Sequence, residues 1–322
     1  MTLEMKAAIY TQYGAPEVLQ IKKTAKPTPT DNEILIKIHA TAVNSGDCRL
    51  RKANPFAVRF FFGLFKPKKN ILGGVLSGVI EAVGKNVQKF KVGDAVFGMT
   101  MLQFGTYAEY ICLPEMGALA IKPANISHDE AAALPFGANT ALFYLQKANV
   151  QPGQKVLIYG ASGAVGSAAV QIAKSFGAVV TGVCSTANLE MVKSIGADHM
   201  VDYTQTDFAK TGEQYDVVYE TVDKAPYSSC IAAVKNGGTL LMGASMLGGM
   251  LQGAWINATS NKKVIFGVAQ ETLESVERLQ KMAESGQLKA VIGNTYPLEQ
   301  IAEAHAYVDK GHKKGNVVIR LV

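Results

Sequence analysis

The segment Lys155–Lys174 reads KVLIYGASGAVGSAAVQIAK, and it decides how the rest of the chain is interpreted. Its opening run, Val156 to Tyr159, is rich in branched apolar residues and predicts a strand buried on both faces. After the glycines, apolar residues recur at helical spacing, and Gly177 stands where such a helix would end. A strand, a tight glycine turn and a helix in this order are typical of a dinucleotide-binding site.

The turn itself carries the expected phosphate contacts. Gly163 would let the backbone approach a pyrophosphate, and Gly166 would let the helix pack closely on the strand. The free N–H groups at the helix start would hold the phosphate charge. The residues expected to contact the cofactor here are Ser162, Gly163, Ala164 and Val165. Ala161 replaces the first glycine of the strict fingerprint, so the motif reads A-x-G-x-x-G.

Length and composition describe a globular protein. A chain of 322 residues predicts two domains or one large one, and 48% hydrophobic with 18% charged residues is typical of soluble proteins. The net charge of +6 could favour an anionic cofactor but does not by itself indicate nucleic acid. We expect a cytoplasmic protein, because no signal layout or spanning apolar run is present and the cysteines form no C-x-x-C pair. The four cysteines are Cys48, Cys112, Cys184 and Cys230.

The first part of the chain, to about residue 124, is predicted to be rich in strands. Ile34, Ile36 and Ile38 alternate with other residues, which indicates a strand with one face more buried than the other. From Gly73 to Gly98, short apolar runs alternate with glycines, and this spacing favours a small, tightly turning barrel.

After Pro123 the pattern changes to alternating helices and strands. A helix is expected over 134–148, followed by the fingerprint strand and helix. The further strands are expected at 179–183, 200–203, 216–220, 239–243 and 264–268, and the further helices at 188–195 and around 273–283. This alternation indicates a doubly wound parallel sheet. The end of the chain, with a helix near 301–308 and a strand at 317–321, again resembles the first part.

One segment is unusual. Between Arg49 and Lys69 there are seven basic residues and no acidic one, interleaved with five phenylalanines that include Phe60, Phe61 and Phe62. Three interpretations stay open: a short buried helix with a solvated basic rim, an apolar lid over a substrate pocket, and a membrane-surface patch. Three consecutive phenylalanines cannot all point inward from a helix or a strand, so at least one ring should reach a cleft or solvent. In the lid interpretation Phe61 and Phe62 would contact the substrate.

Several motifs along the chain occur in the order of one known family. They are Ala42-Val43-Asn44 with Asp47, the run Gly78–Gly84, Phe90–Asp94, Gly105–Tyr110, AAALPFGANTAL at 131–142, the fingerprint, Gly196-Ala197-Asp198 and Gly315–Val318. On these motifs the chain resembles the medium-chain dehydrogenase/reductase superfamily, in its zinc-free quinone oxidoreductase (zeta-crystallin-like) branch. The resemblance implies a Rossmann domain at 125–271 inserted into a GroES-like barrel domain at 1–124 and 272–322, with the active site between them.

The resemblance also allows a residue-by-residue test for zinc. Zinc-dependent members have a cysteine where this chain has Asn44, and Gly-His-Glu where it has Gly73-Gly74-Val75. Their structural-zinc cysteines are also missing. Because thiolate, imidazole and carboxylate ligands are absent at these positions, we expect no tetrahedral zinc site.

Cofactor choice depends on charge at the end of the second strand of the nucleotide-binding sheet. NAD-binding sites place an acid about 20 residues after the glycines, on the ribose hydroxyls. This chain has Ser185, Thr186 and Asn188 there and no carboxylate, and Tyr203 matches a family tyrosine near the adenosine end. NADPH is therefore expected in preference to NADH. The remaining cofactor contacts that the resemblance implies are Asn44, Thr140, Ala244, Phe266 and Asn316.

Without a zinc ion to polarise an alcohol, hydride delivery to an activated acceptor is the expected reaction. The acceptor would be a quinone or an α,β-unsaturated carbonyl. Asn44 is the candidate cleft residue, with local backbone bonding as its alternative role. Asp47 is a second candidate, and a structural cap is its alternative. No general acid can be named.

Two other classes of function stay open. One is a zinc-free carbonyl or alcohol dehydrogenase, and the other is a non-catalytic NADPH-binding protein of the crystallin or RNA-binding kind. No RNA-binding module is recognised. Family resemblance also predicts a homodimer that pairs the edge strands near Val264–Val268.

Overall fold

The computed structural model describes residues 3–243 and 247–322, and its contacts divide the chain into two compact units. The first comprises the chain up to Phe136 together with Glu271–Ser285 and Ala290–Val322. The second comprises Gly137–Gln270 and Gly286–Lys289. Sequence patterning put the first junction near residue 124, whereas the contacts change over between Phe136 and Gly137.

The second unit contains a six-stranded, wholly parallel sheet in the order β10-β9-β8-β11-β12-β13. The strands are β8 (Lys155–Tyr159), β9 (Val179–Cys184), β10 (His199–Asp202), β11 (Tyr215–Glu220), β12 (Val234–Met242) and β13 (Lys263–Ile265). In chain order this is the 3-2-1-4-5-6 arrangement of a dinucleotide-binding fold. The doubly wound parallel sheet expected from the sequence is confirmed.

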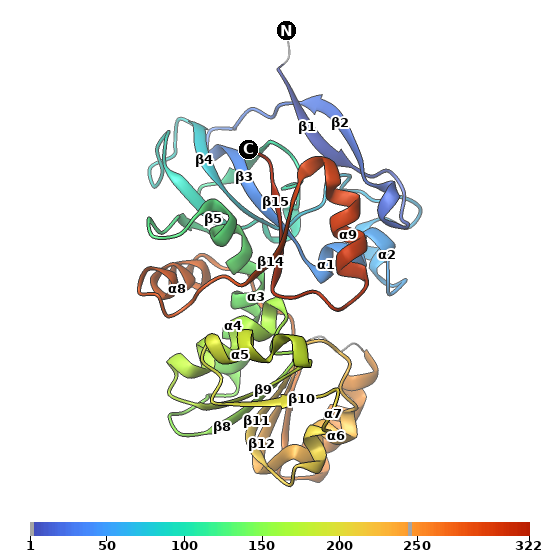
Figure 1. Ribbon diagram of the computed structural model, residues 1–322. Helices are drawn as coiled ribbons and strands as arrows, with labels where there is room; N and C mark the ends of the chain where they lie inside the picture. The colour runs from blue at the N-terminus through green and yellow to red at the C-terminus, as the bar shows by residue number, and fades with distance from the viewer. Residues whose placement is uncertain (1–2, 244–246) are drawn as a thin grey trace. The chain divides into compact units, whose positions relative to one another are not determined.

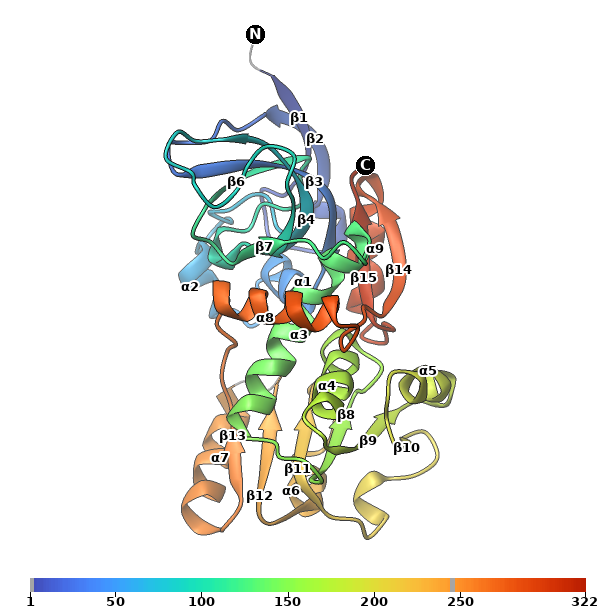
Figure 2. The same ribbon diagram turned by 90° about the vertical axis from the view of Figure 1, so that its left-hand side faces the viewer.

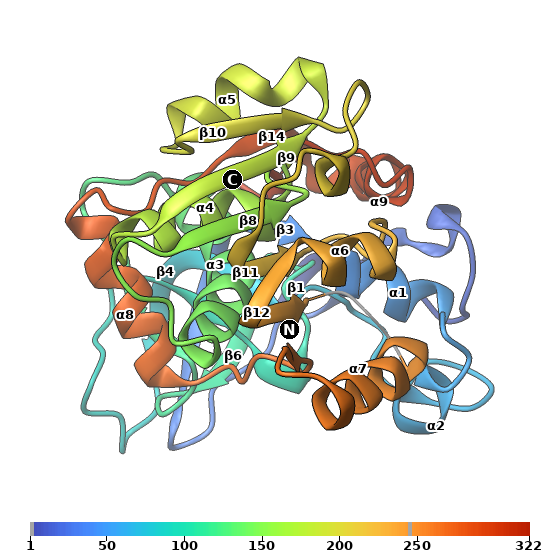
Figure 3. The same ribbon diagram turned by 90° about the horizontal axis from the view of Figure 1, so that it is seen from below.

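Helices cover both faces of this sheet (Figures 1 and 3). They are α3 (His128–Lys147), α4 (Ala164–Ser175), α5 (Leu189–Ser194), α6 (Tyr227–Ala233) and α7 (Leu247–Thr259), with short 3-10 turns η3 (Thr186–Asn188) and η4 (Phe208–Lys210). α4 packs on β8 and β9, and α6 packs on β11 and β12. Within residues 3–243 and 247–322, no helix combines the length and apolar composition needed to cross a bilayer.

Helix α3 begins earlier than the sequence pattern predicts. The expected start was Leu134, but the helix starts at His128 and continues through Pro135. The cause is a capping box in which the Ser127 hydroxyl and the Glu130 carboxylate exchange hydrogen bonds with each other's backbone N–H groups. The S-x-x-E pattern is a local signal for this start that the sequence analysis did not use.

Strand β13 is shorter than predicted, and the backbone N–H and carbonyl of Val264 already bond to a side chain. The expected strand was Val264–Val268, whereas pairing with β12 ends at Ile265. The Asn257 side chain accepts from the Val264 N–H at 2.7 Å and donates to the Val264 carbonyl at 3.1 Å. Edge pairing of a second copy at Val264 would therefore have to displace this amide.

The first unit is built on β3 (Glu33–Val43), which pairs antiparallel with β4, β6 and β15 (Figure 2). Its sheet runs β14-β15-β3-β4-β5-β7 with β6 added on β3, and β1 and β2 form a separate hairpin. The other strands are β1 (Glu4–Ile9), β2 (Gln20–Ala25), β4 (Val75–Val83), β5 (Ala95–Met99), β6 (Tyr110–Pro114), β7 (Leu119–Ile121), β14 (Ile292–Pro297) and β15 (Asn316–Arg320). The helices are α1 (Ser45–Lys52), α2 (Val58–Phe62), α8 (Leu273–Glu284) and α9 (Ile301–Asp309), with 3-10 turns η1 (Pro16–Val18), η2 (Met101–Gln103) and η5 (Leu298–Gln300).

The barrel core confirms the predicted alternation along β3. Ile34, Ile36 and Ile38 are fully buried and pack in one cluster with residues from β4, β5 and β6. Each such isoleucine contributes about 1.5–3 kcal/mol by leaving water. This strand arrangement agrees with the GroES-like barrel domain expected from the sequence.

The phenylalanine-rich segment does not form a buried helix. α2 spans only Val58–Phe62, and Phe60, Phe61 and Phe65 are exposed. The first of the three interpretations is therefore wrong. The physical reason is that a five-residue helix has too little surface to turn three successive rings inward.

Candidate cofactor and catalytic site

The glycine turn after β8 is tied to the neighbouring strand. The N–H groups of Gly160 and Ala161 both donate to the Val183 carbonyl at 3.0 Å. Gly160 has φ +80, and a side chain there would meet Thr221 and Val222. Gly160, and not the residue at position 161, is thus the glycine that the tight turn requires.

Close approach of helix and strand depends on Gly166. A Cβ on Gly166 would lie 2.0 Å from the Gly160 carbonyl oxygen, so no side chain fits. A Cβ on Gly163 would meet the same oxygen only at 3.5 Å, an ordinary contact. The packing role expected of Gly166 is therefore confirmed. Gly163 is the N-cap residue of α4, and a side chain there would occupy the space in front of the first turn of the helix.

The start of α4 fits a pyrophosphate. Ala164 and Val165 are the first residues of a 12-residue helix, and their N–H groups have no acceptor within it. Such N–H groups and the helix dipole favour bound anions. Ser162 lies directly before the N-cap, so all four residues predicted for this contact surround one helix end.

The end of β9 gathers the residues predicted to meet the adenosine side. Ser185 follows the strand, and the Asn188 amide donates to its hydroxyl at 3.0 Å. The Tyr203 N–H donates to the Cys184 carbonyl at 3.1 Å, which holds the half-exposed Tyr203 ring beside this strand end. Thr186 completes the group, so the structure brings all four predicted side chains together.

A carboxylate that sequence reasoning overlooked lies in the same place. Asp202 pairs in register with Cys184, and its side chain accepts a hydrogen bond from the Thr186 hydroxyl. It also accepts from the Thr204 N–H at 2.9 Å and hydroxyl at 2.7 Å. These hydroxyl bonds hold the pKa of Asp202 below its ordinary value. The residues that end β9 carry no carboxylate, as predicted, but parallel pairing places the Asp202 carboxylate at the end of β10 beside them.

A second overlooked acid ends β11. Glu220 is fully buried, and its carboxylate accepts from the N–H groups of Val222, Asp223 and Lys224 at 3.1, 2.8 and 3.2 Å. Burial raises the pKa of Glu220, and these N–H groups lower it in part. Glu220 therefore shapes the turn at the carboxyl end of the strand next to β8.

The other predicted contacts of the second unit are dispersed. Thr140 lies in α3, where its carbonyl accepts from the Tyr219 hydroxyl at 3.5 Å. Phe266 follows β13 and packs partly buried against the core of this sheet. Ala244 lies outside the described residues. Their contacts with a cofactor stay predictions.

In the first unit the structure brings Asn44 and Asn316 together. Val43 and Val317 are paired across β3 and β15, so the two asparagines are neighbours at the ends of these strands. Both are buried. The Asn316 amide nitrogen donates to the Val291 carbonyl at 3.1 Å, and its Oδ1 has no partner among the described residues. An unpaired buried amide oxygen suits a ligand that donates hydrogen bonds.

Asp47 makes the structural contact that was its alternative role. Its carboxylate accepts the Asn44 N–H at 2.9 Å at the start of α1. Burial raises the pKa of Asp47 to about 6, although the Asn44 N–H and the nearby Lys313 ammonium lower it in part. Desolvation lowers the pKa of Lys313 to about 8. The charges of nearby Cys48 and Asp47 raise this pKa in part. Sequence reasoning gave no signal for Lys313, since it is distant along the chain from Asp47.

The two predicted lid residues, Phe61 and Phe62, differ in their exposure to solvent. Phe61 is 76% exposed, whereas the Phe62 ring packs edge-on against Phe104 with centroids 5.8 Å apart. Contact of either ring with a substrate stays a prediction.

Metal ligands are not grouped in the described part of the chain. No set of three or more His, Cys, Asp or Glu side chains there is arranged to hold a metal ion. Asn44 and Val75, at the positions of zinc ligands in other family members, are both buried. His305 is fully buried, with Nδ1 3.4 Å from the Cys48 sulfur, and is a packing residue.

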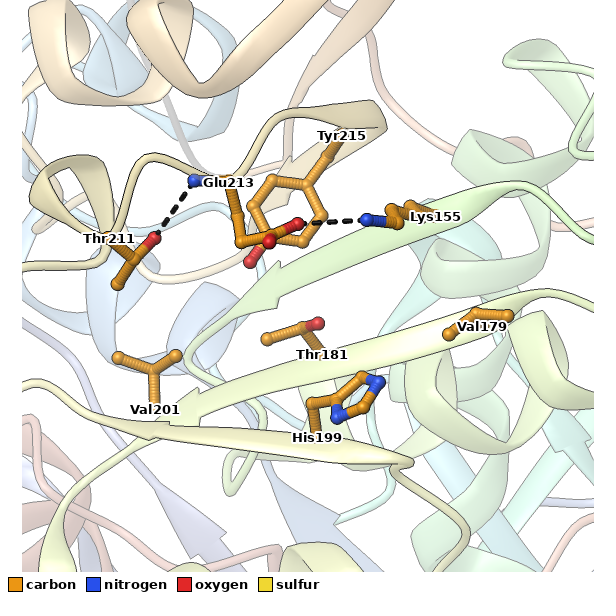
Figure 4. A pocket seen from close by; sticks show the side chains of 8 residues that line it. All are labelled: Lys155, Val179, Thr181, His199, Val201, Thr211, Glu213 and Tyr215. Atoms are coloured by element: carbon orange, nitrogen blue, oxygen red, sulfur yellow. Dashed lines mark hydrogen bonds and ion pairs between the residues drawn. The ribbon is translucent and has the colours of Figure 1, made fainter.

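One pocket of the second unit is lined by residues of β8, β9, β10 and β11 (Figure 4). Its volume is about 300 Å³, and it includes Lys155, Val179, His199 and Tyr215, the first residues of four parallel strands. Glu213 forms an ion pair with Lys155 at 2.8 Å beside it. Cofactors of such sheets bind at the carboxyl ends of the strands, so this pocket is not the nucleotide site.

Comparison with known proteins agrees with this geometry. Residues 30–123 match the alcohol dehydrogenase GroES-like domain, and residues 195–319 match the zinc-binding dehydrogenase domain. The chain is 35% identical to 2-methylene-furan-3-one reductase of Solanum lycopersicum over 98% of its own length and 79% of that protein. The chain belongs to the medium-chain dehydrogenase/reductase superfamily.

Further similarities place it in the quinone oxidoreductase-like branch of this superfamily. It is 31% identical to the NADPH-dependent alkenal/one oxidoreductase of Arabidopsis thaliana over 98% of the chain and 79% of that protein. The solved quinone oxidoreductase of Coxiella burnetii superposes with a TM-score of 0.89 at 27% identity, over 99% of this chain and 100% of that one. This member of the superfamily is an NAD(P)H-dependent oxidoreductase.

Proposed function

We propose that this oxidoreductase uses NADPH to reduce activated acceptors, quinones or α,β-unsaturated carbonyls, without zinc. One observation carries the proposal: the glycine turn is hydrogen-bonded to β9, and the end of β9 carries a cluster of hydroxyl and amide groups. The bound nicotinamide would supply the hydride. The chain's own contribution is to bind and orient the two reactants.

Binding begins at the first turn of α4. The N–H groups of Ala164 and Val165 would hold the pyrophosphate, and Gly163 would leave room for it. Ser185 and Asn188 would donate hydrogen bonds to a 2′-phosphate, beside the ring of Tyr203. The single O–H of Thr186 is bonded to Asp202, so Thr186 would have to give up that bond to join them. Asp202 opposes this, since its charge would repel the phosphate. Its four hydrogen bonds, from Thr186, from the N–H and hydroxyl of Thr204 and from Gln205, offset part of that charge.

The paired asparagines of the first unit would orient the reacting groups. Asn44 and Asn316 are buried side by side, and the Asn316 Oδ1 needs a donor such as a carboxamide N–H. Without a Lewis acid, the acceptor must already carry an electrophilic carbon, as quinones and enones do. The names of the relatives support the same acceptors.

Zinc independence rests on the identity of two residues. Amide and alkyl side chains, at Asn44 and Val75, stand where zinc-dependent members have ligands, and neither binds zinc well. We expect activity to survive prolonged chelation and metal analysis to find less than stoichiometric zinc. Loss of activity on chelation with recovery on adding zinc would disprove this part of the proposal.

A second function is favoured by the two matching family descriptions, which name alcohol and zinc-binding dehydrogenases. One substrate panel separates the two. A quinone, a long-chain enone, a simple aldehyde and a primary alcohol should be compared by kcat/KM with each nicotinamide cofactor. Turnover of quinone or enone with NADPH at least ~10-fold better than of aldehyde or alcohol supports the reductase, and the reverse order supports the dehydrogenase. Cofactor binding with no turnover would indicate the non-catalytic alternative.

A further inference from the structure

An exposed aromatic surface lies on the first unit, away from its core. It consists of large apolar side chains of α2 and of the loops on either side of it, and we call it the aromatic lobe. Its members are Phe56, Phe60, Phe61, Leu64 and Phe65, all exposed. Phe65 is 89% exposed. Single exposed apolar residues are common, but such a run within ten positions marks an interaction site.

The lobe is held in place from its inner side. The Phe62 ring packs on Phe104, and the Tyr13 hydroxyl donates to the Gly63 carbonyl at 2.8 Å. The Arg59 guanidinium lies over the Tyr13 ring at 4.9 Å. The Lys68 N–H donates to the Phe62 carbonyl at 2.8 Å and closes the loop. These anchors fix the backbone of α2 and the loop after it (α2 is labelled in Figure 2), and the outer rings are exposed to solvent.

Exposed positive charge follows the lobe directly along the chain. Lys66, Lys68 and Lys69 are exposed, and no acidic residue occurs between Arg49 and Lys69. Lys68 and Lys69 also line an open pocket of about 330 Å³ on the same unit. Glu33 lines that pocket as well. The excess of lysine favours an anionic partner.

We propose that the aromatic lobe docks on the surface of anionic lipid bilayers. Phenyl rings gain most by entering the acyl boundary of a bilayer, while lysine stems lie along it and place their charges among the phosphates. A second copy is a poorer occupant, because a two-fold contact would bring the same lysines face to face. The proposal does not depend on the acceptor that the enzyme reduces.

The test is binding of the full protein to large vesicles by co-sedimentation. Vesicles of phosphatidylcholine alone are compared with vesicles that contain phosphatidylserine at low and high salt. We expect binding to the anionic vesicles that weakens with salt. The double variant Phe60→Ser and Phe65→Ser should lower the partition constant at least ~10-fold, since each exposed ring it removes would enter the bilayer.

Charge is tested separately with a matched control. Lys66→Glu, Lys68→Glu and Lys69→Glu together should abolish binding, since each lysine near an anionic surface accounts for roughly fivefold. The control changes Lys22, Lys91 and Lys210 to Glu, which alters net charge equally at exposed sites elsewhere, and should keep most of the binding. Thermal unfolding verifies that every variant is folded.

Several results would overturn the proposal. Equal binding of both charge variants would mean that only net charge matters. If the variant with Phe60→Ser and Phe65→Ser binds vesicles as well as the unmodified protein, the lobe does not contact the bilayer. A lobe variant that changes only KM for long apolar acceptors indicates a substrate lid, and one that changes only the mass in solution indicates self-association. Lobe-dependent binding of single-stranded RNA in place of vesicles would indicate a nucleic-acid surface.

Discussion

The hydroxyl of Thr186 donates a hydrogen bond to the carboxylate of Asp202, across the ends of two parallel strands. This contact places a negative charge beside the residues that we propose hold a 2′-phosphate. We expect Asp202→Asn to raise the ratio of kcat/KM for NADPH over NADH by about threefold to tenfold, through lost repulsion. Steady-state kinetics with both cofactors measure it. Glu213→Gln, which removes an exposed acid at the opposite ends of the strands, should leave the ratio unchanged.

The same strand end allows the converse change. Ser185→Asp adds a second carboxylate beside the predicted phosphate position and should shift preference toward NADH, at least ~10-fold, by like-charge repulsion. The ratio of kcat/KM values is again the measurement. Equal efficiency of the two cofactors in the unmodified protein would contradict the proposed NADPH preference.

Gly166 and Gly163 form a matched pair for the glycine turn. Gly166→Ala would drive a Cβ to 2.0 Å from the Gly160 oxygen, so we expect a loss of about 1–3 kcal/mol in the free energy of unfolding. Gly163→Ala has room in the protein and should cost less than about 1 kcal/mol, yet weaken cofactor binding. Denaturation and cofactor titration separate the effects. If both variants lower the free energy of unfolding equally, the backbone around Gly160 moves to accommodate the side chain at position 166.

Burial of Asp47 gives a pH dependence of stability. Because its pKa rises from 3.8 in the unfolded chain to about 6 in the folded protein, the folded state binds its proton more tightly. The stability this contributes is complete below pH 4 and is lost as pH rises through 6. Relative to Asp47→Asn, wild-type protein should therefore lose about 2–3 kcal/mol between pH 4 and 6. Asp94→Asn, which alters a turn cap that accepts from the Lys91 N–H, is the control. A pH-independent difference would mean that Asp47 is not desolvated.

The amide of Asn257 bears on the predicted homodimer. Since it holds both backbone groups of Val264, Asn257→Ala should free them for pairing and strengthen self-association. Sedimentation velocity at micromolar concentration measures this, with Asn261→Ala as the neighbouring control. If self-association is unchanged in both variants, the β13 edge takes no part in a dimer.

Much of the fold follows from local chemistry in the sequence. The apolar run before Gly160 and the helical spacing after it predict β8 and α4, because a buried parallel strand and an amphipathic helix need those patterns. The alternation of Ile34, Ile36 and Ile38 predicts β3 for the same reason. The start of α3 was also encoded locally, in the Ser127–Glu130 capping box, a signal that the sequence analysis did not use.

The contacts that shape the site were decided only by tertiary structure. Asp202 reaches Thr186 because parallel pairing aligns strand ends that are separated along the chain, and Asn316 reaches Asn44 because β15 returns to β3. Lys313 and Asp47 influence each other's pKa for the same reason. A local pattern reports which face of an element is buried, but register between distant strands depends on the packing of the whole sheet. The sequence by itself therefore determined the elements and the glycine turn, and the tertiary structure decided which charges meet there.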